Sequence, residues 1–396
     1  MLREHNMAQT FRLDRLRTAM RSAGIDALIC RLPENVVYIT DYWTHHGFSF
    51  VVFPQDGKPL LFLPEIEEEY AKADWADYTL FGWGLLKDSD LYENYTRLLT
   101  QSRDRLGLAN ATIGVEQTFE VVGPSYRSAE PVVPHAPWTG MLLSVFANAT
   151  LVDAADVIQS ARAIKGEYEL EKLRIANEIA EMGMNAFIQQ LEPGVTEVEV
   201  SALIEHVIRA KGPGHKGARL VRAFAEVGAG VVGSTKGTLL VPSTTYVIRE
   251  GDLVMVELAT VVDGYWSDLT YVAVAGTPTE RQREVYNTVL IAQQAGAQQM
   301  KQGAAFSDPD TAARKILTDA GLGEYFVHIT GHGVGWRYHE FIPFLLPGMP
   351  GTLQTGMVSS IEPGVYIPGF GGIRIEDNVA VGDTGPVFLS TPRTPW

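Results

Sequence analysis

Two neighbouring segments, Asp252-Leu253-Val254-Met255-Val256-Glu257 and Tyr265-Trp266-Ser267-Asp268-Leu269-Thr270, decide the fold of this 396-residue chain. Both are apolar runs that carry an acidic side chain, and they predict strands around Val254–Leu258 and Trp266–Ala275. A carboxylate on an apolar strand is costly to bury unless it is paired or bound to a cation. Glu257 and Asp268 are therefore candidates for a buried site.

Two further segments place histidines and carboxylates in glycine-rich, apolar surroundings. One is Gly331-His332-Gly333-Val334-Gly335, with His339-Glu340 just beyond it, where the glycines let the backbone approach other groups closely. The other combines Ser359–Gly364 with Gly372–Asp377. Four carboxylates and one imidazole from these segments could converge.

This mixed set of oxygen and nitrogen ligands suits two divalent ions such as Mn²⁺, Co²⁺, Fe²⁺ or Zn²⁺. Two such ions can share a water, lower its pKa and polarise a carbonyl group. The residues alone therefore favour a metal-assisted hydrolase. The alternative is that each acid is a surface or capping residue.

The order of predicted elements indicates two domains. Residues 1–160 alternate helix and strand, as in a compact α/β domain, and residues 161–396 combine long helices with antiparallel strands in an α+β domain. A helix is predicted from Glu167 to Gln190, and Thr196 with Glu199 forms a capping box for the next one. The motif Thr277-Pro278-Thr279-Glu280, with proline at the first helical position, opens a helix to about Gln302.

Composition excludes several classes of function. The 32 Lys and Arg against 47 Asp and Glu give a net charge of −15, which opposes binding to nucleic acid or anionic membranes. The single cysteine, Cys30, lies in an apolar strand-like run and is expected to be buried. Met1–Arg12 lacks the apolar core of a signal peptide, and no apolar run of membrane-spanning length occurs. We expect a cytoplasmic protein.

The whole chain resembles the creatinase/prolidase/aminopeptidase P family of metallopeptidases, which have the pita-bread fold and a creatinase-like N-terminal domain. In the first domain the resemblance lies in Arg15–Leu28 and Pro33–Thr40. Ala163-Ile164-Lys165 resembles the linker before the catalytic domain, and the three segments around the acids and histidines match the C-terminal motifs.

The resemblance implies a role for each residue of the predicted site. Glu257, Asp268, His332, Glu362 and Glu376 match the five metal-ligand positions, the first two being eleven residues apart as in the family. His339 matches the histidine that contacts substrate and helps to stabilise the tetrahedral intermediate. Glu362 would manage the proton of the bridging water, and Arg374 resembles a residue that supports the prime-side subsite.

Three positions depart from the family pattern. Glu257 replaces the usual Asp and is one methylene longer. Leu240 occupies the position at which relatives carry a histidine near the scissile bond, which predicts slow turnover. Tyr271 stands where many relatives have Arg, and it is expected either to fill part of the substrate pocket or to pack in a core.

The sequence thus predicts a dinuclear metal-dependent exopeptidase that hydrolyses the bond before proline in short peptides. By resemblance it forms a homodimer and uses Mn, Co or Zn. One alternative is a hydrolase or lyase of a small non-peptide molecule on the same fold, which the loss of the histidine and the presence of Tyr271 favour. The other is a non-catalytic binding homologue.

Overall fold

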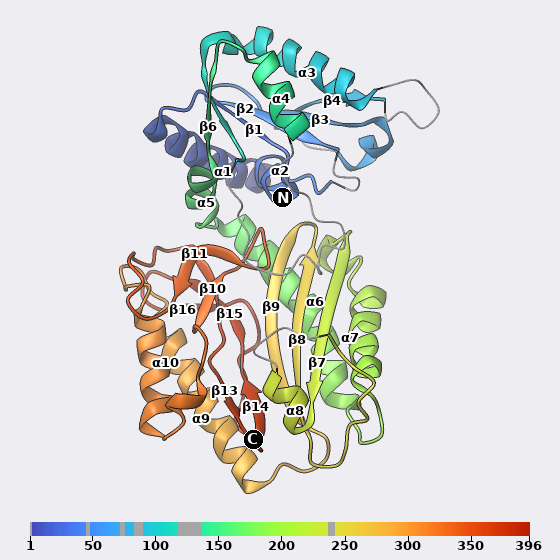
Figure 1. Cartoon of the computed structure of the whole chain (residues 1–396), viewed down its shortest axis with the longest axis vertical. Coiled ribbons are helices and arrows are strands. Elements are labelled where there is room, and N and C mark those ends of the chain that lie inside the picture. The colour runs from blue at the N-terminus through green and yellow to red at the C-terminus, as the bar shows by residue number, and fades with distance from the viewer. Residues whose placement is uncertain (1, 45–47, 72–75, 83–89, 118–135, 237–241) are drawn as a thin grey trace. The chain divides into compact units, whose positions relative to one another are not determined.

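The computed structural model describes residues 2–44, 48–71, 76–82, 90–117, 136–236 and 242–396 (Figure 1). The chain divides into two compact units, Met1–Arg162 and Ala163–Trp396. Leu240 lies outside the described residues.

The first unit is built on a six-stranded mixed sheet with the strand order β4-β3-β2-β1-β5-β6. Strands β1 and β2 are antiparallel, as are β2 and β3, whereas β5 runs parallel to β1. Cys30 is a buried free cysteine at the end of β1, as predicted. The elements are α1 (Leu2–Ala23), β1 (Ala27–Cys30), α2 (Pro33–Thr40), β2 (Phe50–Pro54), β3 (Leu60–Pro64), β4 (Asp77–Phe81), α3 (Leu91–Leu106), β5 (Thr112–Val115), α4 (Ala136–Val145), β6 (Thr150–Asp153) and α5 (Ala155–Arg162).

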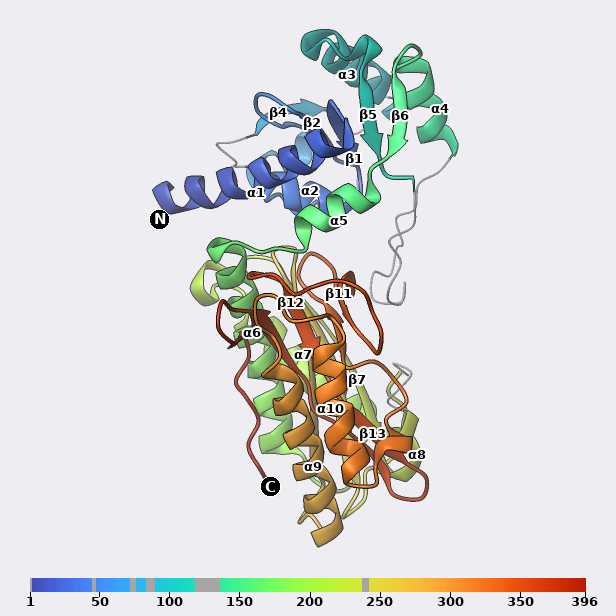
Figure 2. The same cartoon turned by 90° about the vertical axis from the view of Figure 1, so that its left-hand side faces the viewer.

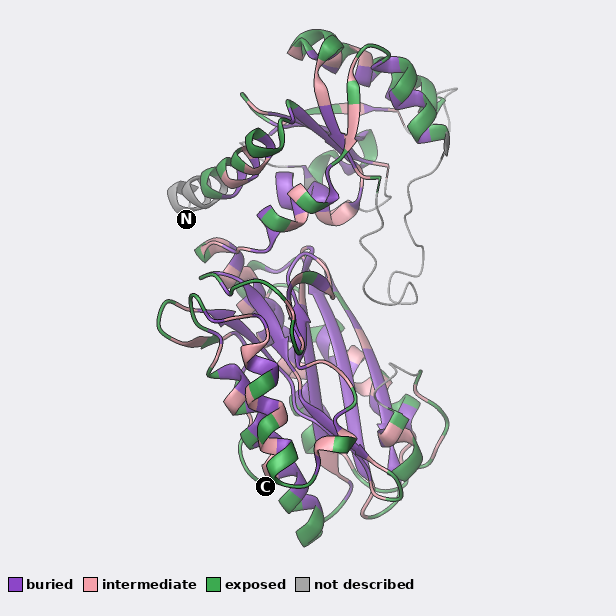
Figure 3. Ribbon diagram, turned by 60° about the vertical axis from the view of Figure 1, so that its left-hand side comes forward, coloured by how far each residue is buried: buried purple, intermediate pink, exposed green. Residues whose placement is uncertain are grey.

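The second unit begins with two helices that cover one face of an antiparallel sheet of order β7-β8-β9. Every residue of β8 is buried, and Figure 3 shows the long strands of this unit mostly buried. The expected helix from Glu167 to Gln190 is present with those bounds. The elements of this half are α6 (Glu167–Gln190), α7 (Glu197–Lys211), β7 (Val221–Ala229), α8 (Gly230–Thr235), β8 (Leu253–Val262) and β9 (Tyr265–Val274).

The remaining half of the unit pairs two helices with a five-stranded sheet of order β11-β10-β12-β15-β16 and a hairpin of β13 and β14. Helices α9 and α10 run side by side (Figures 1 and 2). The predicted α+β class is confirmed. The elements are α9 (Glu280–Ala297), α10 (Asp308–Asp319), β10 (Gly331–Gly333), β11 (Glu340–Leu345), β12 (Val358–Ile361), β13 (Gly364–Ile367), β14 (Gly371–Arg374), β15 (Asp377–Val381) and β16 (Pro386–Phe388).

Local capping chemistry sets the helix starts, and it corrects one prediction. The capping box of α7 is present, since the Thr196 amide donates to the Glu199 carboxylate over 2.7 Å. In α9, however, the N-cap is Thr279, so Pro278 precedes the helix instead of occupying its first turn. This helix also ends at Ala297 and not near Gln302. Beyond Ala297, backbone amides donate to the carbonyl three residues earlier instead of four, as in a 3₁₀ turn.

The alternation of side chains along β9 positions the site. Leu269 and Tyr271 face α6 and α7, within an apolar cluster that includes Val256 of β8. Successive side chains on a strand point to opposite faces, so Asp268 and Thr270 face away from these helices. In the register of the sheet Thr270 lies directly opposite Glu257 of β8. One strand thus presents apolar groups to the helices and polar groups to the other half of the unit.

In the first unit, Glu116 follows β5 and binds the start of α2. Its carboxylate accepts hydrogen bonds from the Arg31 amide over 2.8 Å, the Leu32 amide over 3.1 Å and the Asn35 side-chain amide over 2.8 Å. Loss of hydration outweighs these bonds and raises the pKa of Glu116 to about 7. The folded protein therefore holds this proton more tightly than the unfolded chain does.

This shift predicts a pH dependence of stability. The stabilisation from the neutral Glu116 carboxyl is complete below its ordinary pKa near 4.5 and is lost as the pH rises through 7, by up to about 3 kcal/mol. Glu116→Gln should remove this part of the slope, as measured by urea unfolding at several pH values between 4 and 8. The exposed Glu284→Gln serves as control. Equal slopes in wild type and Glu116→Gln would contradict the assignment.

Candidate metal centre

The predicted carboxylates of the two long strands lie together on the polar face of the sheet. Glu257 and Asp268 are both buried, with 7% and 1% of their surfaces exposed. Carboxylate oxygens of Glu257, Asp268 and Glu376 lie within 4.8 Å of one another. The structure therefore brings together three of the predicted ligands, from β8, from β9 and from the turn between β14 and β15.

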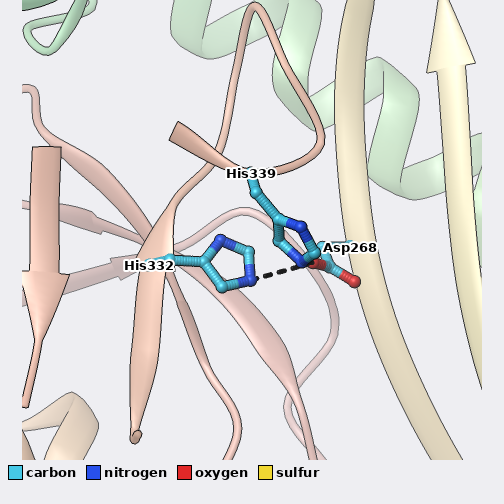
Figure 4. A group of neighbouring side chains, drawn as sticks. All are labelled: Asp268, His332 and His339. Atoms are coloured by element: carbon cyan, nitrogen blue, oxygen red, sulfur yellow. Dashed lines mark ion pairs between the residues drawn. The ribbon is translucent and has the colours of Figure 1, made fainter. Parts of the chain in front are cut away.

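Two histidines approach the same aspartate from the other half of the unit (Figure 4). His332 Nε2 lies 3.4 Å from Asp268 Oδ2, and His339 Nε2 lies 4.0 Å from the same oxygen. The Nδ1 atom of His332 is 3.0 Å from the Gly333 carbonyl oxygen, which can only accept. That hydrogen bond keeps a proton on Nδ1 and directs Nε2 toward Asp268, so Nε2 is the atom that a metal would bind.

Glu362 follows β12 and completes the cluster. Its amide donates to the Thr330 carbonyl over 2.8 Å, and Ser360 Oγ donates to its carboxylate over 3.0 Å. His332 Nε2 lies 3.3 Å from Glu362 Oε1. Burial alone raises the pKa of Glu362, but the hydrogen bond and charge of His332, together with the charge of Arg374, lower it below the ordinary value. Glu362 is therefore held ionised beside the histidine.

Glu376 has the opposite behaviour. It is fully buried, and the loss of hydration together with the charges of Asp268, Glu362 and Glu257 raises its pKa well above the ordinary value. Its Oε1 atom has no hydrogen-bond partner among the described residues. A fully buried carboxylate oxygen in this position is unfavourable unless a cation binds it. Oxygen and imidazole ligands of this kind fit divalent transition ions, so the residues fit the metal that the sequence predicts.

The hydroxyl of Thr270 lies between two of the carboxylates and Arg374. Its Oγ1 atom lies 2.7 Å from Glu257 Oε2, 2.7 Å from Glu376 Oε2 and 2.8 Å from Arg374 Nε. Arginine can only donate, and the hydroxyl has one proton, so it donates to only one of the two carboxylates. The third contact is favourable only if the other carboxyl carries a proton, which agrees with the raised pKa of Glu376.

A buried network behind the cluster includes residues that the sequence analysis did not assign. Arg374 is 3% exposed, and its Nη2 atom donates to Glu257 while Nη1 donates to the Tyr366 hydroxyl over 2.9 Å. His328 Nε2 lies 2.9 Å from the same hydroxyl. The Tyr338 hydroxyl donates to the second oxygen of Glu257. His328 lies four residues before His332 and Tyr338 beside His339, and this proximity in sequence is the only signal that could have found them.

A buried ion pair fixes the segment that carries the second histidine. Lys165 Nζ lies 2.8 Å from Glu340 Oε2, and their side chains are 1% and 5% exposed. Gly335 is needed here, because a Cβ atom at that position would lie 2.6 Å from Lys165 Cε. The family-like linker lysine therefore contacts the residue after His339.

Tyr271 lies away from the cluster. Its side chain is on the opposite face of β9 from Asp268 and Thr270, within the apolar cluster that faces α6. The packing of Tyr271 in this apolar cluster agrees with the expected core position. Its place in a substrate pocket stays a prediction.

The network predicts that Arg374 holds Glu257 in the metal-free protein. Arg374→Met should leave a buried carboxylate without its cation and lower the free energy of unfolding by about 3 kcal/mol or more. Chemical denaturation of the chelated protein measures this loss, and added Mn²⁺ should recover part of it. The exposed Arg281→Met, which loses only a surface pair, should change stability by less than about 1 kcal/mol. Similar losses in the two variants would refute the role.

Comparison with known proteins identifies the class. Residues 171–383 match the model of metallopeptidase family M24, and residues 12–164 match that of the creatinase/prolidase N-terminal domain. The Xaa-Pro dipeptidase of Lactobacillus delbrueckii subsp. lactis is 33% identical over 371 residues, with 92% of each chain covered. The Xaa-Pro dipeptidase of Pyrococcus furiosus is 31% identical over 382 residues, with 96% of this chain and 97% of the relative covered.

Solved structures agree. The crystal structure of the prolidase from Pyrococcus horikoshii OT3 has a TM-score of 0.75 and 28% identity, and covers 96% of this chain and 98% of its own. The fold and the site thus define a two-domain metallopeptidase. The chain belongs to metallopeptidase family M24 and carries the creatinase/prolidase N-terminal domain, which confirms the resemblance seen in the sequence. Among the described residues, no helix is long and apolar enough to cross a membrane.

Proposed function

We propose that this chain is a metal-dependent exopeptidase that hydrolyses the bond before proline in short peptides. The observation that carries the proposal is the buried Glu376 oxygen without a hydrogen-bond partner, inside a cluster of acids and histidines from separate segments. The family membership and the relatives named Xaa-Pro dipeptidase support the reaction class. The proposed ligands are Glu257, Asp268, His332, Glu362 and Glu376.

When bound, two divalent ions supply Lewis acidity and lower the pKa of a water that attacks the peptide carbonyl. The residues of the chain do the rest. Glu362, whose pKa is held low beside His332, accepts the proton of the attacking water and later delivers it to the departing amine. His339 donates a hydrogen bond to the oxygen on which negative charge develops. Arg374 and Thr270 hold the carboxylate of Glu257 in place.

Slow turnover belongs to this proposal, because Leu240 stands at the position of a family histidine and leaves His339 as the remaining imidazole of the substrate site. A homodimer also remains a prediction from the family resemblance.

A second candidate is hydrolysis or lysis of a small non-peptide molecule. It is favoured by Glu257, which replaces the family Asp. Both of its carboxylate oxygens accept hydrogen bonds from neighbouring side chains, one from Arg374 and one from Tyr338. Glu257 can bind a metal only if it gives up its hydrogen bonds to Arg374 and Tyr338. This change at the first metal-ligand position is therefore compatible with a change in the reaction.

The metal part of the proposal is tested by metal analysis. Wild-type protein reconstituted with Mn²⁺, Co²⁺ or Zn²⁺ should retain close to two ions after removal of excess metal. Glu376→Ala should retain far less, because Glu376 lies within reach of both Glu257 and Asp268. Glu284→Ala on the exposed surface of α9 is the matched control and should bind as wild type does. Unchanged metal content in Glu376→Ala would contradict the two-metal assignment.

The reaction is tested with a panel of dipeptides. The metal-loaded wild type should hydrolyse Ala-Pro and Leu-Pro and leave Ala-Ala and Pro-Ala largely intact. His339→Ala should lower kcat by about 10²-fold or more while metal content stays unchanged. A metal-loaded protein that cleaves none of these peptides would transfer support to the non-peptide reaction. Hydrolysis of Ala-Ala at the rate of Ala-Pro would contradict the preference for proline.

A further inference from the structure

A cavity lies beside β9. It has a volume of about 340 Å³ and is lined by parts of α6, β9, α9 and the segment of residues 391–396. Tyr271 is one of its lining residues, as is Thr270, whose hydroxyl contacts Glu257 and Glu376. The cavity therefore adjoins the carboxylate cluster, although none of the five proposed metal ligands lines it.

Two buried donors in this cavity are unused. Tyr271 is 3% exposed, and its hydroxyl has no hydrogen-bond partner among the described residues. The guanidinium of Arg393 lies over the Tyr271 ring, 3.9 Å from its centre, and the Arg393 Nε atom is also buried without a hydrogen-bond partner in the described part of the chain. Burial raises the pKa of the Tyr271 hydroxyl above its ordinary value, so the group keeps its proton as a donor. Both groups call for an acceptor.

The neighbouring acid pairs with Arg393 at ion-pair distance without accepting a hydrogen bond from it. Glu181 accepts hydrogen bonds from the amide of Thr391 over 2.5 Å and from its hydroxyl over 3.0 Å. Arg393 Nη2 lies 3.8 Å from Glu181, beyond hydrogen-bond distance, and donates to the Thr391 carbonyl instead. The cation therefore keeps a donor for a further anion. Glu181 and the buried Asp377 add negative charge nearby and disfavour an anion with two charges.

The rest of the wall is apolar. The rings of Tyr286 and Trp396 stack with their centres 3.9 Å apart and their planes within 8°. Both residues line the cavity, together with Ile188 and Pro392. A compact apolar body fits beside these groups, while the donors fix one charged end.

We propose that this cavity binds a small monoanionic carboxylate with a compact apolar body, held by the Arg393 guanidinium and the Tyr271 hydroxyl. The ligand is either a simple organic acid or a free amino acid, since both present the same carboxylate. The proposal is independent of the reaction carried out at the metal centre.

Calorimetric titration of the full-length protein tests the ligand class. The probes are benzoate and L-proline, each compared with its amide, benzamide or prolinamide, which lacks the carboxylate. At least one acid binds, and its amide binds about tenfold more weakly or not at all, because the charge-assisted bond to Arg393 is lost. Binding of benzoate identifies a simple acid, and binding of L-proline identifies an amino acid. Absence of binding by both acids, or equal binding of acid and amide, overturns the proposal.

Variants locate the binding. Arg393→Met weakens it about tenfold or more, and Tyr271→Phe, which keeps the ring and removes only the hydroxyl, weakens it about threefold or more. Arg281→Met on the exposed face of α9 and the metal-site variant Glu376→Ala leave it unchanged. Thermal unfolding confirms that each variant is folded, and Tyr271→Phe carries the test if Arg393→Met is not. Retained affinity in Tyr271→Phe overturns the proposal, as does loss in Glu376→Ala, which would place the binding at the metal centre.

Discussion

The crowding of Glu257, Asp268 and Glu376 within 4.8 Å is the constraint on which the rest of the second unit depends. Two like charges about 4 Å apart repel by roughly 4 kcal/mol at the effective dielectric constant of a protein surface, and by more where water is excluded. The chain meets this cost with one buried arginine and with a raised pKa of Glu376. Neither satisfies the second oxygen of Glu376, so the site is complete only with an additional cation.

The same constraint explains the order of the surrounding structure. The five predicted ligands come from five separate segments, and hydrogen bonds of the backbone fix several of these segments. The Glu376 amide donates to the Thr270 carbonyl over 3.2 Å, and the His332 amide donates to Ser360 Oγ over 3.1 Å. The first of these bonds joins the two halves of the unit across the site, and the second joins β10 to β12 within one half. A shift of either half would therefore break ligand geometry and backbone pairing together.

Interactions between residues close in sequence could be predicted, whereas those between residues far apart in sequence could not. The capping box of Thr196 and Glu199 and the bounds of α6 depend on neighbours in sequence and could be read directly. The convergence of the acids depends on long-range packing, and only the family resemblance placed all five ligand positions together. Tyr338 donates a hydrogen bond to Glu257, and Arg374 donates one to Tyr366. These contacts have no periodic signal in the sequence, so no spacing rule finds them.

Tyr271 shows why a residue near a motif need not share its function. It follows Thr270 directly, yet strand alternation turns its side chain toward α6. Glu257 is a different case. It keeps the carboxylate that the family has at this position, and its additional methylene lengthens the side chain. Its carboxylate contacts Arg374, Tyr338 and Thr270 at once, so metal must compete with three existing partners. In the proposed metal site, the replacement of Asp by Glu would therefore change the free energy of metal binding through these partners of Glu257 while keeping a carboxylate at this position.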